Sequence, residues 1–157
     1  MAEEIIEQGY RELADTILEH NPGVDLGRVR AAFELADRAH SGQKRKAGTP
    51  YVTHCVAAAQ ICAEMGLDED SIVAALLHDC IEDTAITHED IARQFGAEVA
   101  DIVEGVTKLT RVQFTSREDE QMENLRKMLM AMAKDIRVIL IKIADRLHNM
   151  RTMEYMV

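Results

Sequence analysis

Apolar residues recur at helical spacing along most of the chain. After Asp25, which suits a helix N-cap, the apolar positions are three or four residues apart, as on one face of a helix. Before it, residues 3–20 have the pattern of a polar amphipathic helix, and Asn-Pro-Gly at 21–23 predicts a turn. The apolar positions of this second predicted helix are Leu26, Val29, Ala32, Phe33 and Ala36.

Punctuation residues divide the rest of the chain into further helices. A loop at 41–51 precedes a helix from about Val52 to Met65, which Gly66 ends. Asp68 or Asp70 can cap an apolar helix that ends in His-Asp-Cys at 78–80. Thr87 and Asp90 form a capping-box pattern for a short helix that stops before Gly96. Two more helices are predicted, one at 97–107 and one beginning at Ser116.

The last apolar segment, DIRVILIKIADRLHNM at 135–150, fits a buried strand or a buried helix. Its length exceeds that of a typical strand, no turn signal interrupts it, and no other segment offers a pairing partner. We therefore expect a helix. The fold class predicted for residues 1–157 is one all-α domain, a compact multi-helix bundle.

The stretch HDCIEDT at 78–84 follows the strongly apolar SIVAALL. Burying carboxylates and imidazoles without partners is costly, so a positive charge is expected beside them. A metal ion would supply it. Because neighbours on one helix point about 100° apart, further ligands must come from other elements.

Four side chains are candidate ligands, two imidazoles and two carboxylates: His54, His78, Asp79 and Asp145. This mixed set suits manganese, iron or zinc. Each residue also has a structural interpretation. A single helical histidine is often only hydrogen-bonded, and Asp145 could pair with Arg146 or Arg137.

Composition narrows the function. The formal charge of −10 argues against general nucleic-acid binding, and only 4% of residues are aromatic, which argues against a stacking surface for single strands. No apolar run has the length of a membrane span. The three cysteines, Cys55, Cys62 and Cys80, form no CxxC pair, which predicts a reducing, cytoplasmic location.

Several motifs together resemble the hydrolase domain of the RelA/SpoT alarmone enzymes, which belong to the HD-domain phosphohydrolases. They occur in that family's order and spacing over about residues 28–153: AHSGQKRKAGTPYVTH, AALLHDCIEDT, FGAEVADIVEGVTKL and NLRKMLMAMAKDIRVILIKIADRLHNMRT. The resemblance implies metal-dependent removal of the 3′-pyrophosphate of guanosine tetra- or pentaphosphate, with Mn²⁺ as the usual metal.

The resemblance also implies roles for particular residues. The four candidate ligands match the family's metal ligands, and Glu82 and Asp83 match its ED pair, which positions or activates the attacking water; a solvated turn is their structural alternative. Thr84 could simply satisfy backbone groups. Positions that match the family's nucleotide site, or lie close enough to add charge to it, are Arg45, Lys46, Lys142, Arg146, Asn149 and Thr152. Arg146 could instead hold Asp145 or Glu82 in place, and His148 is expected to have a structural role.

The chain also departs from the family pattern. Ala47 replaces a serine that could touch the ligand, and Cys55 replaces a proline at a helix start. Cys55 and Cys80 are expected to be small buried apolar residues. The chain stops at MEYMV, before the helices that usually complete this domain, so it resembles a fragment of a longer enzyme that could carry a synthetase region.

Two alternative functions remain open at this point. One is an HD phosphohydrolase acting on ordinary nucleotides, against which QKRKAG and DRLHNMRT count because both go beyond the shared metal motif. The other is a catalytically silent regulatory module, against which the retained HD and ED pairs count. The sequence does not indicate an oligomeric state.

Overall fold

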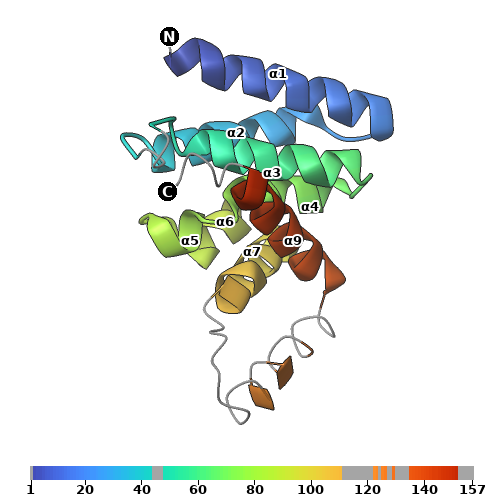
Figure 1. Cartoon of the computed structure of the whole chain (residues 1–157), viewed down its shortest axis with the longest axis vertical. Helices are drawn as coiled ribbons and strands as arrows, with labels where there is room; N and C mark the ends of the chain where they lie inside the picture. Colours follow the sequence, from blue (N-terminus) through green and yellow to red (C-terminus); the bar gives the residue numbers. More distant parts are fainter. Residues whose placement is uncertain are drawn as a thin grey trace.

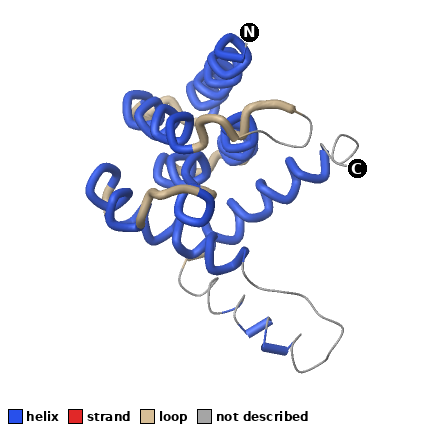
Figure 2. The backbone as a smooth tube through the Cα atoms, turned by 90° about the vertical axis from the view of Figure 1, so that its left-hand side faces the viewer, coloured by secondary structure: helices blue, strands red, loops and turns tan. Residues whose placement is uncertain are grey.

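The computed structural model describes residues 2–43, 48–110 and 135–151, together with 122, 123, 125, 126 and 129. Every regular element in these ranges is a helix, which confirms the predicted all-α class (Figure 2). The helices that lie wholly within the continuous described ranges are α1 (Ala2–His20), α2 (Leu26–Ala39), α3 (Val52–Glu64), α4 (Glu69–Leu77), α5 (Cys80–Asp83), α6 (His88–Phe95), α7 (Ala97–Thr110) and α9 (Ile136–Arg151). None of the described helices is long and apolar enough to cross a membrane.

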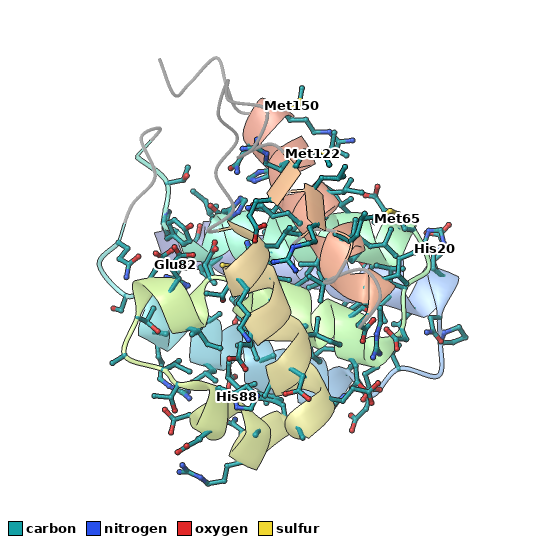
Figure 3. All side chains as sticks on the ribbon, turned by 90° about the horizontal axis from the view of Figure 1, so that it is seen from below. His20, Met65, Glu82, His88, Met122 and Met150 are labelled. Atoms are coloured by element: carbon teal, nitrogen blue, oxygen red, sulfur yellow. The ribbon has the colours of Figure 1, made fainter. Side chains whose placement is uncertain are left out.

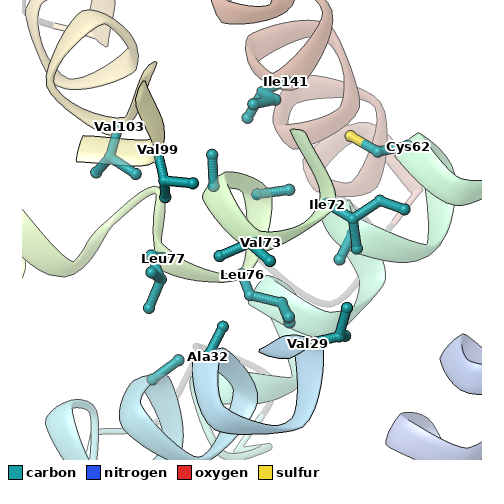
Figure 4. Close-up of a cluster of buried hydrophobic side chains, with 14 of the residues drawn as sticks. Val29, Ala32, Cys62, Ile72, Val73, Leu76, Leu77, Val99, Val103 and Ile141 are labelled. Carbon is teal, nitrogen blue, oxygen red and sulfur yellow. The ribbon is translucent and has the colours of Figure 1, made fainter. Parts of the chain in front are cut away.

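Helix α4 is the centre of the bundle. All seven residues from Ser71 to Leu77 are buried, so this helix is enclosed on every side, as a helix that is apolar all round must be. It contacts α2, α3, α7 and α9. Figure 4 shows its side chains between those of α2 and α7, with Ile72, Val73, Leu76 and Leu77 in the middle of the cluster. The end of α4 is therefore a fixed point within the core.

The other helices form layers around α4. Helix α1 lies across the outer side of α3, and α7 and α9 cross beneath α3 and α4 (Figure 1). Helix α9 contacts α3, α4 and α7. The segment at 135–150 is thus a helix, as predicted. A helix beginning at Ser116 was also predicted, but residues 111–121 lie outside the described part of the chain.

The predicted caps are present. Asp25 accepts hydrogen bonds from the backbone N–H groups of Gly27 and Arg28, and Asp68, rather than Asp70, caps α4 by accepting from Ser71 N. Thr87 and Asp90 form the predicted capping box of α6. Each of these side chains satisfies backbone donors that a helix start leaves without partners.

The His78–Asp79 pair interrupts the helix that was expected to include it. Helix α4 ends at Leu77, where the His78 N–H bonds to the Ala75 carbonyl oxygen at 3.4 Å, three residues back, and tightens the last turn. Asp79 follows with φ −98° and ψ −2°, and the short helix α5 begins at Cys80. The sequence did not predict α5. Its consequence is that His78 and Asp79 lie in a turn between two helices.

Two arginines join the ends of separate helices. Arg28 of α2 donates to Glu69 and Asp70 at the start of α4 and to the carbonyl oxygen of Phe95 at the end of α6. Arg137 of α9 similarly bonds to Asp68, Glu98 and Asp135. Arg137 therefore does not pair with Asp145, which was one structural alternative for that carboxylate.

A glycine allows α7 and α9 to approach closely. A Cβ atom at Gly105 would lie 2.7 Å from Cγ2 of Val138, closer than carbon atoms can pack. Val138 is buried and β-branched, so it has little freedom to move away. A Cβ atom at Gly9 in α1 would lie an ordinary 3.6 Å from Cγ1 of Val56. Gly105 thus sets the distance at which α9 crosses α7.

We expect Gly105→Ala to destabilise the protein although alanine favours helix by ~1 kcal/mol, because overpacking of this kind costs about 1–3 kcal/mol. Gly9→Ala is the matched variant and should stabilise it by roughly 0.5–1 kcal/mol, since its Cβ fits. Urea unfolding of both variants measures these changes. Stabilisation by both substitutions would show that α7 and α9 do not meet at Gly105.

Candidate metal centre

Four predicted ligands converge from separate parts of the fold. His54 lies in the first turn of α3, His78 and Asp79 lie between α4 and α5, and Asp145 lies on α9. Each offers one ligand atom, and these atoms all lie within 4.8 Å of one another. His54, His78 and Asp145 are buried and Asp79 is half-buried. The structure therefore brings together the group that the sequence could only propose.

Both imidazoles turn the same ring nitrogen toward the carboxylates. Nε2 of His54 lies 2.5 Å from Oδ1 of Asp145, and Nε2 of His78 lies 3.2 Å from the same oxygen. Nε2 of His78 also lies 3.0 Å from Oδ2 of Asp79. Two nitrogen and two oxygen donors thus face one point in the interior.

The backbone fixes which nitrogen of His78 faces the carboxylates. Its Nδ1 lies 2.6 Å from the carbonyl oxygen of Ala75. A carbonyl oxygen can only accept, so Nδ1 carries a hydrogen and donates it. In the neutral ring the lone pair is then on Nε2, the nitrogen that faces Asp79 and Asp145.

Each carboxylate has a partner outside the group. The Tyr51 hydroxyl donates to Oδ2 of Asp79 at 2.8 Å, and the Lys142 ammonium lies 2.9 Å from Oδ2 of Asp145. Tyr51 thus holds the same Asp79 oxygen that faces His78, whereas Lys142 holds the Asp145 oxygen that the imidazoles leave unused. Outer partners of this kind orient metal ligands in proteins.

The charges within the group shift one another's ionisation. Burial opposes the charge of His78, but Asp79 and Asp145 outweigh it and raise the pKa of His78 to about 10. Burial likewise opposes the charge of Asp79, yet His78 and the Tyr51 hydroxyl lower its pKa to about 2. Burial also opposes the charge of Asp145, but hydrogen bonds from His54 and His78 outweigh it and hold the pKa of Asp145 far below its usual range. The two aspartates therefore carry negative charge, which a bound cation would balance.

The donor atoms fit a divalent transition metal. Ligand atoms about 2.1 Å from one ion can be no more than ~4.2 Å apart, close to the 4.8 Å limit within which this group lies. A set of two imidazoles and two carboxylates suits manganese, iron or zinc. In a metal-free protein, a proton on His78 would supply the compensating positive charge instead.

The predicted catalytic pair lies beside this group on α5. Glu82 and Asp83 are both exposed, and Figure 3 shows Glu82 at the surface. Burial and the negative charge of Asp79 raise the pKa of Asp83. Thr84 donates to the carbonyl oxygen of Cys80 and accepts from Ile86 N, so it satisfies backbone groups in the loop as one interpretation expected.

The predicted nucleotide-binding residues divide into two sets. Lys142, Arg146 and Asn149 lie on α9, where Arg146 is exposed and Asn149 is half-buried. Lys142 contacts Asp145 directly. Arg45, Lys46, Ala47 and Thr152 lie outside the described residues. Cys55 and Cys80 are free and buried, as expected.

Sequence reasoning missed two residues that touch the group. Tyr51 was counted only as the end of a loop, yet it bonds to Asp79. His148 was assigned a structural role, yet its Nδ1 lies 2.7 Å from Nδ1 of His54. The spacing of Asp145 and His148, three residues apart in a helix, places both on one face and was the available signal.

Comparisons with known proteins identify the family of the chain. The family model described as HD domain matches residues 32–156, which is most of the chain. The chain belongs to the HD-domain family. Among curated proteins, this HD domain is 51% identical over 144 residues to the bifunctional (p)ppGpp synthase/hydrolase SpoT of Escherichia coli (strain K12), covering 92% of this chain and 20% of SpoT.

Other relatives give the same picture. The GTP pyrophosphokinase of Myxococcus xanthus is 49% identical over 144 residues, which cover 90% of this chain and 19% of the relative. A solved structure of a metazoan ortholog of SpoT, described as hydrolysing ppGpp and playing a role in starvation responses, matches with TM-score 0.63 and 34% identity over 81% of this chain and 70% of that one. The HD domain thus spans about a fifth of the two bacterial relatives' length.

The raised pKa of His78 predicts a pH dependence of stability in chelator-treated protein. Because the folded pKa is about 10 and the usual value is 6.5, the proton on His78 contributes its full stabilisation below pH 6.5 and loses it as the pH rises toward 10. His78→Gln lacks this proton. The difference in unfolding free energy between wild type and His78→Gln should therefore shrink over that range, as measured by urea unfolding in excess chelator.

A difference that stays constant from pH 6.5 to 10 would contradict this assignment of the proton to His78. His20→Gln is the matched control, because His20 is an exposed histidine at the end of α1. Its unfolding free energy should follow that of the wild type at every pH.

Proposed function

We propose that this HD domain hydrolyses the 3′-pyrophosphate of guanosine tetra- or pentaphosphate, giving GDP or GTP and pyrophosphate. The observation that carries the proposal is the buried group of His54, His78, Asp79 and Asp145, whose donor atoms lie within 4.8 Å of one another. Support comes from relatives about half identical to the chain, one of which is named as a (p)ppGpp synthase/hydrolase. The metazoan ortholog described as hydrolysing ppGpp adds a solved fold.

In this proposal the four side chains hold one divalent cation, and Mn²⁺ is the metal that we propose. His78 offers Nε2 because Ala75 holds its Nδ1 hydrogen, and Asp145 offers an oxygen that already faces both imidazoles. When bound, such a cation would neutralise charge on phosphate oxygens and make the attacking water more acidic. The nitrogen and oxygen donors favour Mn²⁺ over a thiophilic ion.

Glu82 and Asp83 orient or deprotonate the attacking water. Both carboxylates lie on α5, directly after the Asp79 turn, so they are near the cation site and open to solvent. The raised pKa of Asp83 makes its carboxylate a better proton acceptor than an ordinary aspartate. The pair can therefore take a proton from water that enters from the exposed side.

Basic and amide side chains hold the nucleotide. Arg45 and Lys46 meet the base or the phosphates, a role for which the planar guanidinium suits both stacking and bidentate contact. On α9, Lys142 already contacts Asp145, so its ammonium lies within reach of a phosphate beside the cation. Asn149, Arg146 and Thr152 complete the proposed set. The basic members of this set would supply positive charge for an anionic nucleotide in a chain of formal charge −10.

The chain acts in this proposal as a single hydrolase domain. The name of the E. coli relative combines synthase and hydrolase, and the chain matches 20% of that protein. A synthetase region in the same parent protein, and a cytoplasmic location, remain predictions. Neither is needed for the hydrolytic reaction.

The proposal is tested with ppGpp, Mn²⁺ and purified protein, by measuring GDP and pyrophosphate release. Asp79→Asn and Asp145→Asn preserve side-chain size but remove a charged ligand, and each should lower turnover by at least ~100-fold, beyond the 10–100-fold typical of an outer partner. Chelator should abolish turnover in the wild type. Asp15→Asn, at an exposed position on α1, is the matched control and should keep full activity.

A substrate panel separates this function from its alternatives. The proposal expects ppGpp to be hydrolysed far faster than GTP or deoxynucleoside triphosphates under one condition. Equal or faster hydrolysis of the triphosphates would indicate a general nucleotide hydrolase. Mn²⁺ binding without turnover of any substrate would indicate a regulatory module and overturn the proposal.

A further inference from the structure

His148 lies against the outer side of a proposed metal ligand. Its Nδ1 is 2.7 Å from Nδ1 of His54, and the two rings lie 4.9 Å apart with an interplanar angle of 30°. His148 is on α9, three residues after Asp145, so the two side chains leave the same face of that helix one turn apart. His54 therefore has α9 residues at both ring nitrogens, Asp145 at Nε2 and His148 at Nδ1.

Two ring nitrogens at this distance share one hydrogen. One must donate and the other accept, because two lone pairs or two N–H groups facing each other would repel. His54 turns Nε2 toward Asp145 and the interior of the group. For that nitrogen to offer a lone pair to a cation, the neutral ring must carry its hydrogen on Nδ1. His148 must then accept at Nδ1 and carry its own hydrogen on Nε2.

The two ligand histidines are thus held by different means. His78 donates to the carbonyl oxygen of Ala75, a backbone acceptor that no side-chain substitution removes. At His54, by contrast, the partner of Nδ1 is a side chain, that of His148. His54 is only 2% exposed, so water has little access to its ring as a substitute acceptor. The hydrogen bond at Nδ1 of His54 therefore involves a side chain that a substitution at position 148 can remove.

We propose that His148 is a positioning residue, which accepts a hydrogen bond from Nδ1–H of His54 and so holds Nε2 of His54 toward the cation. The inference rests on the proposed function only in requiring a cation at this site. It makes no demand on the nucleotide. Outer partners of this kind change metal affinity by about 10–100-fold in proteins.

The experiment compares two substitutions at one position. His148→Phe keeps a ring but has no acceptor, and His148→Gln keeps an acceptor in its amide oxygen. We expect His148→Phe to weaken Mn²⁺ binding about 10–100-fold, measured by calorimetry without nucleotide, and His148→Gln to restore most of the loss. His20→Phe, at an exposed histidine on α1, should leave the affinity unchanged.

A second measurement uses the unaltered protein. Long-range ¹H–¹⁵N correlation spectra of the Zn²⁺-loaded wild type report which nitrogen of each histidine carries the hydrogen. The inference expects Nδ1–H in His54 and Nε2–H in His148. If His148→Phe weakened Mn²⁺ binding only by disturbing packing, His148→Gln would not restore the affinity. Packing alone would also not determine which nitrogen of each histidine carries the hydrogen. The spectra also decide the question if His148→Phe fails to fold.

Three results would overturn this inference alone: unchanged Mn²⁺ affinity in folded His148→Phe, equal losses in the phenylalanine and glutamine variants, or a hydrogen on Nε2 of His54. A wild type that binds no cation would overturn both this inference and the proposed function. A wild type that binds Mn²⁺ through His54 but does not hydrolyse ppGpp would sink the proposed function alone, because the affinities and tautomers are measured without nucleotide.

Discussion

The charges of one group of side chains, His54, His78, Asp79 and Asp145, determine what this fold can bind. Asp79 and Asp145 are held in their negative form beside two imidazoles at the end of the most buried helix. Carboxylates in such a place need positive partners, because an isolated buried charge costs several kcal/mol. A proton on His78 supplies positive charge in the metal-free protein, and a divalent cation would supply more while leaving the imidazoles neutral. The arrangement thus favours cation binding.

The surrounding helices explain why the group is held so closely. Helix α4 is enclosed on all sides and cannot shift, so the turn after Leu77 fixes His78 and Asp79. Helix α9 approaches α7 as closely as Gly105 allows and also contacts α3. That crossing brings Asp145 and His148 to the two nitrogens of His54. Packing in the apolar core therefore determines the geometry of a polar site.

Much of this could be predicted from the sequence, and the reason lies in local chemistry. The caps Asp25, Asp68 and Thr87 act within a few residues of their own positions, so their patterns are readable before the structure is known. Periodicity likewise indicated the helix at 135–150. Residue chemistry named the four candidate ligands, but the family resemblance was needed to indicate that they form one site, since residues 54, 79 and 145 are far apart in the chain.

The features that were missed depend on contacts between helices. The break between α4 and α5 places Asp79 beside Tyr51, and neither the break nor this contact leaves a periodic signal. His148 was recognisable as a neighbour of Asp145 on one helical face, but only the crossing of α3 and α9 shows that it meets His54. Side chains around a site are therefore harder to predict than its ligands, because they share no motif.

The central claim is that His54, His78, Asp79 and Asp145 bind one divalent cation, and pulsed electron paramagnetic resonance of the Mn²⁺-loaded protein tests it most directly. We expect hyperfine couplings from two imidazole nitrogens, one of which disappears in His54→Gln and the other in His78→Gln. A spectrum without nitrogen couplings, like that of hydrated Mn²⁺ or of an ion held only by surface carboxylates, would contradict the claim.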